Sequence, residues 1–215
     1  MKTIIFDFDG TIADSFVLFV DILHKLMGRT ERVSATELER LRGMSLLQAA
    51  REVHVPWWRL PLLASRGRRM MLGAIDEVHP CQGMPEALKT LHADGYQLFI
   101  MSSNSALNID TFLKTHGLAG LIDKVYPGVS LFGKARTLRK VIRQNRFNRG
   151  DVMYVGDEVR DIQGAKRAGI KVVSVTWGYN NADILERHAP DGLVYAAAEL
   201  PDVVHKLQPL GDSAD

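Results

Sequence analysis

Four short apolar runs, partly β-branched, constrain the fold of this 215-residue chain most strongly. They occupy Thr3–Phe8, Tyr96–Met101, Val152–Val155 and Val172–Val175. Each is short enough for a strand and apolar enough to be buried on both faces, which is typical of a parallel sheet. The sequence therefore predicts a core built on parallel strands.

Helical stretches separate these runs. The expected helices are 86–94, 135–146 and 161–168. Pro85 stands in the first turn of the first helix and Gly95 directly follows it, while Gly169 follows the third. Strands that alternate with helices predict an α/β fold with a doubly wound parallel sheet, a Rossmann-like core.

Residues 15–81 break this alternation, because the stretch reads as helix almost throughout. Its apolar residues at helical spacing are Phe16, Phe19, Val20, Leu23 and Met27. Ser34–Glu37 has the form of a capping box. Further helices are expected over Leu46–Val53 and Leu62–Val78, with a corner at Pro56–Pro61 between them.

A helical block between the first and second strands of an α/β core predicts an inserted cap. We therefore expect residues 1–14 and 82–215 to form the α/β core and residues 15–81 to form a helical cap domain. Trp57 and Trp58 lie in the corner of the expected cap, where we interpret them as packing residues because Trp buries a large apolar area.

The composition is that of a globular protein and excludes several classes. The chain is 46% hydrophobic and 24% charged, which argues against disorder. Lys and Arg total 27 against 25 for Asp and Glu, so the charge does not indicate a nucleic-acid partner. Arg66, Arg68 and Arg69 form the densest basic spot, which we interpret as a solvated helix face.

The single cysteine, Cys81, excludes an internal disulfide framework and suits a reducing cytosol, where a free Cys usually acts as a small core residue. The chain opens directly into a strand, without the pattern of a signal peptide. No apolar run approaches the ~20 residues of a membrane span. We expect a cytoplasmic protein without a membrane partner.

The first candidate site is DFDGT, residues 7–11, directly after Ile4-Ile5-Phe6. Residues two apart in a strand point to the same side, so Asp7 and Asp9 should face together at the carboxyl edge of the sheet, where open α/β sheets bind ligands. Two carboxylates there repel unless a cation, a proton or a basic side chain compensates. Gly10 allows a sharp turn or a close approach to a ligand.

An EF-hand calcium loop does not fit this stretch. That loop needs glycine at its sixth position and glutamate at its twelfth, where this chain has Ile12 and Leu18.

Two further signals suit a phosphate group. Ser102, Ser103 and Asn104 follow the strand expected at 96–101, and hydroxyls with free backbone N–H groups at such a place form a natural anion site. Lys134 follows Gly133 just before an expected helix and could neutralise a phosphate.

A third acidic site follows the strand Val152–Val155. Asp157 comes directly after this strand and Gly156, and Asp161 lies four residues beyond it. A third acid at the same sheet edge suits Mg²⁺, which takes one or two protein carboxylates together with substrate phosphate and water.

These signals occur in one order, each at a strand end, and as a set they resemble the haloacid dehalogenase superfamily. The resemblance is to its capped phosphatase branch, which includes phosphoglycolate phosphatases, and it spans nearly the whole chain. The matching motifs are DFDGT, SSN, GK and GDEVRD. One departure is Glu158, which stands where many relatives have a small residue.

The resemblance implies a role for each motif residue. Asp7 would be the nucleophile and Asp9 the general acid and base, and Lys134 would hold the phosphate and offset the carboxylates. Ser102 would bind the phosphoryl oxygens, with Ser103, Asn104, Gly10 and Thr11 also contributing to the substrate site; whether Ser102 or Ser103 supplies the hydroxyl stays open. Mg²⁺ would rest on Asp7, the backbone carbonyl of Asp9 and Asp157, with Asp161 bound through water or supporting from behind.

The implied reaction is hydrolysis of a small phosphorylated metabolite. A carboxylate that attacks phosphorus makes an aspartyl phosphate and divides one hard hydrolysis into two easier steps. Phosphoryl transfer depends mainly on positioning and charge neutralisation, which a metal, a lysine and backbone N–H groups supply. The cap would exclude water and carry the substrate contacts.

Several alternatives to this hypothesis remain. Residues 128–135, GVSLFGKA, match a P-loop as far as its lysine, but Ala135 replaces the Ser or Thr that would bind Mg²⁺. A receiver domain has no room for the helical insertion, and a dehalogenase would need neither Asp9 nor Asp157. A phosphomutase would keep every motif, and a non-catalytic binding protein is also conceivable. The sequence specifies neither the substrate nor the oligomeric state.

Overall fold

A six-stranded parallel sheet forms the centre of the protein. The computed structural model describes residues 2–28, 33–52, 55–130 and 133–209. The strands are β1 (Thr3–Phe6), β2 (Gln97–Met101), β3 (Lys124–Tyr126), β4 (Val152–Gly156), β5 (Lys171–Val175) and β6 (Gly192–Val194). Their order across the sheet is β3-β2-β1-β4-β5-β6, and every neighbouring pair is parallel.

Helices cover both faces of this sheet. One face packs against α5 (Met84–Ala93), α6 (Ala106–Thr115) and α10 (Leu200–Leu207), and the other against α7 (Lys134–Gln144), α8 (Val159–Ala168) and α9 (Ala182–Arg187). Side chains alternate between the two cores along each strand, so Ile4 and Phe6 lie in the first and Ile5 in the second. The predicted doubly wound α/β fold is therefore confirmed.

The predicted core elements all exist, with boundaries shifted by a few residues. The strand expected at 3–8 ends at Phe6, so Asp7 lies beyond it. The helix expected at 161–168 begins at Val159 and ends before Gly169, whose φ of 75° is the left-handed conformation that favours glycine. Cys81 is a free, buried core residue, as expected.

Two edge strands, β3 and β6, were not expected from the sequence, because three residues are too few to show a pattern. Each is preceded by an aspartate that bonds to the neighbouring strand. Asp123 Oδ2 accepts a hydrogen bond from the Leu98 N–H at 2.8 Å, and Asp191 Oδ2 accepts one from the Val172 N–H at 2.8 Å. These carboxylates fix the start of both edge strands.

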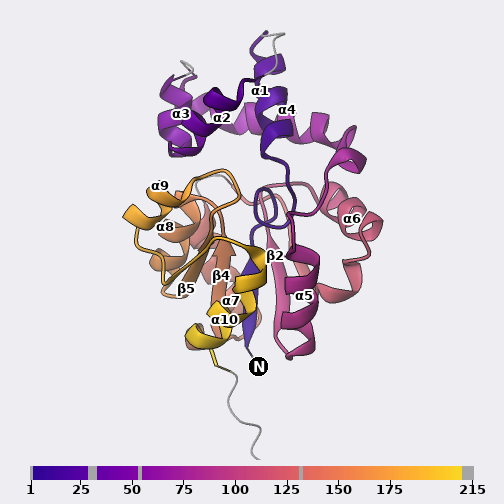
Figure 1. Ribbon diagram of the computed structural model, residues 1–215, viewed down its shortest axis with the longest axis vertical. Helices are drawn as coiled ribbons and strands as arrows, with labels where there is room; N and C mark the ends of the chain where they lie inside the picture. Colours follow the sequence, from indigo (N-terminus) through magenta and orange to yellow (C-terminus); the bar gives the residue numbers. More distant parts are fainter. Residues whose placement is uncertain (1, 29–32, 53–54, 131–132, 210–215) are drawn as a thin grey trace, which may run out of the picture.

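Helices α1 (Phe16–Leu26), α2 (Ala35–Arg42), α3 (Leu46–Glu52) and α4 (Leu60–Leu72) form a separate layer beyond the carboxyl ends of the strands (Figure 1). We call residues 15–81 the cap. The expected capping interaction at Ser34 is present, because its Oγ accepts a hydrogen bond from the Glu37 N–H at 3.2 Å. The helix expected at 46–53 ends at Glu52, and Val53 lies outside the described residues.

The second half of the cap differs from the prediction. A 3₁₀ turn covers Trp57–Arg59, α4 begins at Leu60 rather than Leu62, and a second 3₁₀ turn covers Ile75–Glu77. Pro61 therefore lies in the first turn of α4, where its missing N–H costs nothing. The interpretation of Trp57 and Trp58 as packing residues is wrong, since they are 65% and 60% exposed.

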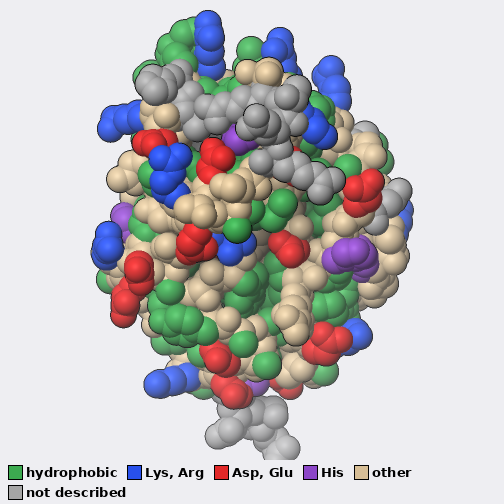
Figure 2. All heavy atoms as spheres, turned by 45° about the horizontal axis from the view of Figure 1, so that its top comes forward, with side chains coloured by type: hydrophobic (Ala, Val, Ile, Leu, Met, Phe, Trp, Pro, Cys, Tyr) green, Lys and Arg blue, Asp and Glu red, His purple; other side chains and the backbone are tan. Residues whose placement is uncertain are grey.

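Basic side chains gather at the cap end of the molecule in Figure 2. Arg66 and Arg69 on α4 are exposed, as expected for a solvated helix face, and the side chain of Arg68 lies outside the described residues. No helix in the described parts of the chain has the length and apolarity needed to cross a membrane.

The two connections between cap and core pair with each other. Ala13 forms an antiparallel bridge with Pro80, the Asp14 N–H donates to the His79 carbonyl, and the Cys81 N–H donates to the Ile12 carbonyl. We propose that this pairing marks the boundary between two domains, with residues 1–14 and 82–215 as the core and 15–81 as the cap.

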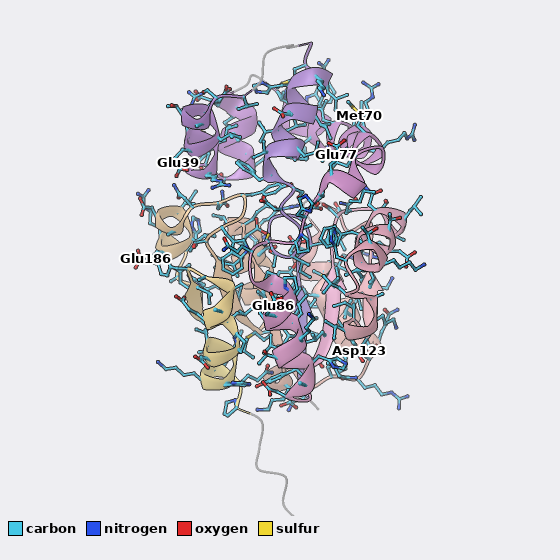
Figure 3. The ribbon with its side chains drawn as sticks, turned by 45° about the vertical axis from the view of Figure 1, so that its right-hand side comes forward. Glu39, Met70, Glu77, Glu86, Asp123 and Glu186 are labelled. Carbon is cyan, nitrogen blue, oxygen red and sulfur yellow. The ribbon has the colours of Figure 1, made fainter. Side chains whose placement is uncertain are left out.

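Replacing Asp123 tests how the edge strands are fixed. Asp123 lies at the end of the core opposite the cap (Figure 3), far from the strand ends that face the cap. Asp123→Ala leaves the buried Leu98 N–H without its acceptor, so the free energy of unfolding should fall by about 1–3 kcal/mol. Asp123→Asn keeps an acceptor oxygen and should lose much less. Urea denaturation of both variants measures this, and equal stability of parent and Asp123→Ala would contradict the role of the carboxylate.

Candidate active site

The candidate site lies where the strand order reverses. From β1 the chain builds the sheet outward to β2 and β3 on one side, and later to β4, β5 and β6 on the other. In open α/β sheets the crevice at the carboxyl ends of the two strands at this switch point binds ligands. Asp7 directly follows β1, and Asp157 directly follows β4. Both carboxyl ends face the cap (Figure 1).

Asp7 is buried and paired with Lys134. Its Oδ2 accepts from the Lys134 ammonium at 2.7 Å, and its Oδ1 accepts from the Phe8 N–H at 2.8 Å. The same ammonium also bonds to the Asp161 carboxylate. Burial alone would lower the pKa of Lys134, but Asp161 and Asp7 outweigh it and raise that pKa above its ordinary value. Lys134 is therefore a permanent positive charge between two acids.

Two helices position this lysine. Lys134 is the first residue of α7, and α7 packs directly against α8. At their contact Gly164 faces the lysine stem, because a Cβ at Gly164 would come within 3.1 Å of Lys134 Cγ. A glycine at this point leaves room for the side chain of Lys134 to run across α8 toward the strand ends.

Asp157 is fully buried and held at both oxygens. Oδ1 accepts from the Thr11 hydroxyl and Oδ2 from the Tyr179 N–H, each at 2.7 Å. Gly10 and Gly178 enclose it so closely that a Cβ on either would lie 2.3 Å from Oδ2. These contacts fix the orientation of the carboxylate.

Asp161 lies in the first turn of α8. Its Oδ2 accepts from the Glu158 N–H at 2.9 Å, and so helps to cap the helix, while Oδ1 bonds to Lys134. A Cβ at Gly156 would lie 2.5 Å from Oδ2. Asp161 therefore supports the helix and the lysine at once.

The carboxylates of Asp7, Asp157 and Asp161 fit a metal ion. Each offers an oxygen within 4.8 Å of the others. Burial raises the pKa of Asp157 well above its ordinary value, and Glu158, Asp161 and Asp7 raise it further. Burial also raises the pKa of Asp161 to about 6, although Lys134 opposes this. Such pKa values indicate that the cluster lacks positive charge, and its oxygen ligands suit a hard cation such as Mg²⁺.

Asp9 lies apart from this cluster, on the side of β2. Its carboxylate accepts from the Ser15 hydroxyl at 3.1 Å, and both of its oxygens accept from the Asn104 amide at 3.1 Å. Burial raises the pKa of Asp9 to about 6 and Asp7 adds to this, while the bonds from Ser15 and Asn104 and the charge of Arg160 partly oppose it. A carboxyl group with this pKa can exchange a proton near neutral pH.

The loop after β2 brings the expected polar residues to the same edge. Ser102 is fully buried and its Oγ accepts from the Asn104 N–H at 3.0 Å, whereas Ser103 is half-buried. The Asn104 side chain is oriented by the Asn108 amide, which donates to its Oδ1 at 2.7 Å. The amide of Asn104, and not its backbone alone, thus contacts Asp9, which the sequence did not suggest.

Asp7 and Asp9 reach the site differently from the prediction, which placed both on one continuing strand. The strand ends at Phe6, and residues 8–13 form a compact turn in which the Phe8 carbonyl accepts from the Ile12 and Ala13 N–H groups. Gly10 adopts a φ of 76° in this turn, which favours glycine.

The loop after β5 contributes residues that the sequence analysis missed. The Tyr179 hydroxyl lies 3.3 Å from Ser15 Oγ, and its ring packs on Phe16 and Phe19 of the cap with centroid distances of 5.1 and 5.5 Å. The Asn180 side chain accepts from the Val159 N–H and donates to the Met44 carbonyl of the cap at 2.7 Å. This loop therefore joins the acids to the cap.

A largely apolar cavity of ≈110 Å³ lies between cap and core. Cap residues such as Phe16, Leu23 and Met44 line most of it, and the core contributes Glu158, Tyr179 and Asn180. Because Tyr179 and Glu158 also adjoin the acids, the cavity borders the candidate active site.

The chain matches the family model for haloacid dehalogenase-like hydrolase over residues 4–175. This chain belongs to the haloacid dehalogenase-like hydrolases. The assignment confirms the resemblance inferred from DFDGT, SSN, GK and GDEVRD. The P-loop alternative has no support, because the lysine of that pattern, Lys134, bonds to Asp7 and Asp161.

Relatives within the family extend over nearly the full chain. A phosphoglycolate phosphatase of Synechococcus elongatus is 32% identical over 209 residues, which cover 96% of this chain and 99% of that protein. Pyrophosphatase PpaX of Halalkalibacterium halodurans is 25% identical over 213 residues, covering 95% and 97%. The crystal structure of a predicted phosphatase from Clostridium acetobutylicum has a TM-score of 0.78 at 19% identity, with 95% and 98% covered, and shows the shared fold.

Gly178 offers a test of the metal site that does not remove a ligand. In Gly178→Ala the new Cβ would displace the Asp157 carboxylate, so the Mg²⁺ concentration that gives half of the Mg²⁺-induced rise in Tm should increase about 10–100-fold. Gly120→Ala is the matched control, because no atom lies within 4 Å of its Cβ position. Thermal melting over a Mg²⁺ titration measures both variants, and an unchanged midpoint in Gly178→Ala would contradict the assigned ligand.

The same measurement has a predicted pH dependence. Because folding raises the pKa of Asp161 from 3.8 to about 6, the metal-free folded state retains a proton that the unfolded chain releases, and its free energy of unfolding falls as pH rises through this window. A cation binds the ionised form, so Mg²⁺ should raise Tm more above pH 6 than at pH 5. A shift of equal size at both pH values would argue against binding to these carboxylates.

Proposed function

We propose that this hydrolase is a Mg²⁺-dependent phosphatase that cleaves a small phosphate monoester through an aspartyl-phosphate intermediate. The observation that carries the proposal is the buried pair of Asp7 and Lys134, which stands beside two further buried acids and within reach of a carboxyl group with a raised pKa. A single site thus combines a nucleophile, a proton donor and a place for a cation.

Asp7 is the proposed nucleophile. It directly follows the central strand β1, and its bonds to Lys134 and the Phe8 N–H fix the carboxylate in one orientation. Bound Mg²⁺, held by Asp7, the Asp9 carbonyl and Asp157 with Asp161 in support, would neutralise charge on the phosphoryl oxygens. Lys134 contributes a second positive charge at the same place.

Asp9 is the proposed acid and base. A pKa raised to about 6 means that Asp9 keeps its proton to higher pH than an ordinary aspartate, so it can protonate the leaving oxygen in the first step. The ionised form that results can then take a proton from the water that attacks the aspartyl phosphate. Ser15 and Asn104 hold Asp9 in place for both steps.

The substrate-binding groups proposed for the phosphoryl oxygens are Gly10, Thr11, Ser102, Ser103, Asn104 and Lys134. Thr11 and Ser102 are fully buried beside the acids. The backbone N–H groups of Gly10, Thr11, Ser102 and Asn104 bond within the protein, so hydroxyl groups and Lys134 carry most of the proposed contacts. The Ser102 Oγ already accepts from the Asn104 N–H, which leaves its own O–H free to donate. This favours Ser102 over Ser103 as the phosphate-binding hydroxyl.

Phosphoglycolate is the first substrate to test, because a relative that is 32% identical over almost the full length of the chain is a phosphoglycolate phosphatase. We infer a small phosphorylated metabolite as partner and a cytoplasmic location, and both remain predictions. Purified protein with Mg²⁺ or excess chelator should be assayed against phosphoglycolate, pyrophosphate, sugar phosphates and nucleotides. Phosphate release that needs Mg²⁺ supports the proposal, and equal release in chelator would refute the metal requirement. Conversion of a sugar phosphate without release would indicate a phosphomutase.

Asp9→Asn separates the two chemical steps. With 4-nitrophenyl phosphate the leaving group needs little protonation, so Asp7 should still be phosphorylated, but hydrolysis loses its base and should slow by about 10²–10⁴-fold. Rapid mixing should show a burst of about one nitrophenolate per active site followed by slow turnover.

The matched variants are Asp7→Asn, which should give no burst, and Asp202→Asn, an exposed acid on α10 that should behave like the parent. If Asp9→Asn cleaved alkyl phosphates at the parent rate, Asp9 would not be the acid–base group.

A further inference from the structure

Arg160, in the first turn of α8, has no role in the chemistry described above. It pairs with Glu158, with 2.5 Å between Arg160 Nη2 and Glu158 Oε1. Both side chains are largely buried, at 21% and 8% exposed. A buried ion pair next to an active site needs an explanation beyond helix stability, since such pairs are expensive to desolvate.

The guanidinium group is incompletely satisfied. Arginine carries five N–H donors in a planar fork, and Glu158 is bonded at Nη2. Arg160 Nε is buried and has no hydrogen-bond partner among the residues that the structure describes. A buried donor in this state commonly marks a place where a ligand or an ordered water binds.

Glu158 places Arg160 next to the cavity between cap and core. Its partner Glu158 lines the cavity between cap and core together with Tyr179, whose hydroxyl reaches Ser15 and so adjoins Asp9. Arg160 is also one of the groups that oppose the rise in the pKa of Asp9, which burial and Asp7 cause. Its charge also interacts with Asp7 and Asp161, so Arg160 lies close both to the acids and, through Glu158, to the cavity that borders them.

The phosphoryl group itself is served by other residues. Lys134 bonds to both Asp7 and Asp161, and these two acids also belong to the carboxylate cluster that fits a metal ion. The hydrogen bond of Arg160 goes to Glu158, and its Nε, which has no partner among the described residues, could serve a different part of the substrate.

We propose that Arg160 is a specificity-determining residue that binds a second anionic group, a carboxylate or a second phosphate, on the leaving-group part of the substrate. A carboxylate and a phosphate each present two oxygens, which the planar guanidinium group of an arginine can bind with two parallel hydrogen bonds. The ammonium group of a lysine lacks this bidentate geometry. Glu158 orients the guanidinium. The inference rests on the proposed phosphatase function and adds a substrate class, namely small esters or anhydrides whose second negative charge lies close to the ester oxygen.

The test compares substrates that differ in the second charge. Phosphoglycolate carries a carboxylate, pyrophosphate a second phosphate, and ethyl phosphate neither. In Arg160→Gln the ratio of kcat/KM for phosphoglycolate or pyrophosphate to that for ethyl phosphate should fall about 10–100-fold, as expected for the loss of charge-assisted hydrogen bonds. If the phosphoglycolate ratio falls, Arg160 binds a carboxylate. If the pyrophosphate ratio falls, it binds a second phosphate.

Two further variants make the result specific. Arg167→Gln changes an exposed arginine near the other end of α8 and should leave both ratios unchanged. Arg160→Lys keeps the positive charge but loses the planar guanidinium group, so the kcat/KM ratios should fall by a smaller factor than in Arg160→Gln. If circular dichroism shows that Arg160→Gln is unfolded, the ratios of Arg160→Lys provide the test.

The outcomes separate this inference from the proposed function. If the parent cleaves none of the three substrates, the phosphatase proposal fails first. If it cleaves ethyl phosphate but both ratios are the same in the parent and the Arg160 variants, the inference is wrong. An equal loss on all three substrates would also overturn it, because Arg160 would then serve the shared phosphoryl group.

Discussion

The bond network around the Lys134 ammonium is the interaction on which the site depends. Asp7 and Asp161 come from segments more than 150 residues apart in the chain, and both are buried against this one cation. An unpaired charge in such a place would be strongly destabilising, and removing one partner of a buried pair typically costs about 3–5 kcal/mol. Lys134 therefore makes it possible for β1 and β4 to end side by side in carboxylates.

The lysine does not balance the charge completely. Asp157 and Glu158 are buried beside the pair, and Arg160 is bonded to Glu158. The remaining negative charge appears as raised pKa values at Asp157, Asp161 and Asp9. A hard cation bound at these carboxylates would offset the excess negative charge, and perturbed pKa values of this kind are concentrated at functional sites.

The loop after β5 connects this chemistry to the cap. The Tyr179 N–H holds Asp157 while its ring packs on Phe16, and the Asn180 amide joins the first turn of α8 to the Met44 carbonyl. A movement of the cap would pull on the same loop that orients a proposed metal ligand. Tyr179 and Asn180 therefore link the position of the cap to the orientation of Asp157.

Much of this arrangement could be predicted from the sequence, because apolar strands that end in DFDGT, SSN and GDEVRD fix both the sheet and its active edge. The features that the sequence did not predict also have physical explanations. Strands β3 and β6 are three residues long and are positioned by Asp123 and Asp191 rather than by a hydrophobic pattern. Tyr179 and Asn180 follow the predicted strand at 172–175, and the rule that ligands bind at strand ends would have pointed to them. Nothing in the spacing, however, shows that the Asn180 amide will bond both to the cap and to the first turn of α8.

Trapping the intermediate tests the central claim most directly. Asp9→Asn mixed with 4-nitrophenyl phosphate and quenched within the burst should carry the phosphoryl group on Asp7, and reduction of the acyl phosphate by borohydride should convert that residue to homoserine. Peptide mass spectrometry then locates the change. We predict homoserine at position 7, in an amount that matches the burst. Labelling at another residue, or a burst without any labelled Asp7, would contradict the account of Asp7 as the nucleophile that Lys134 holds in place.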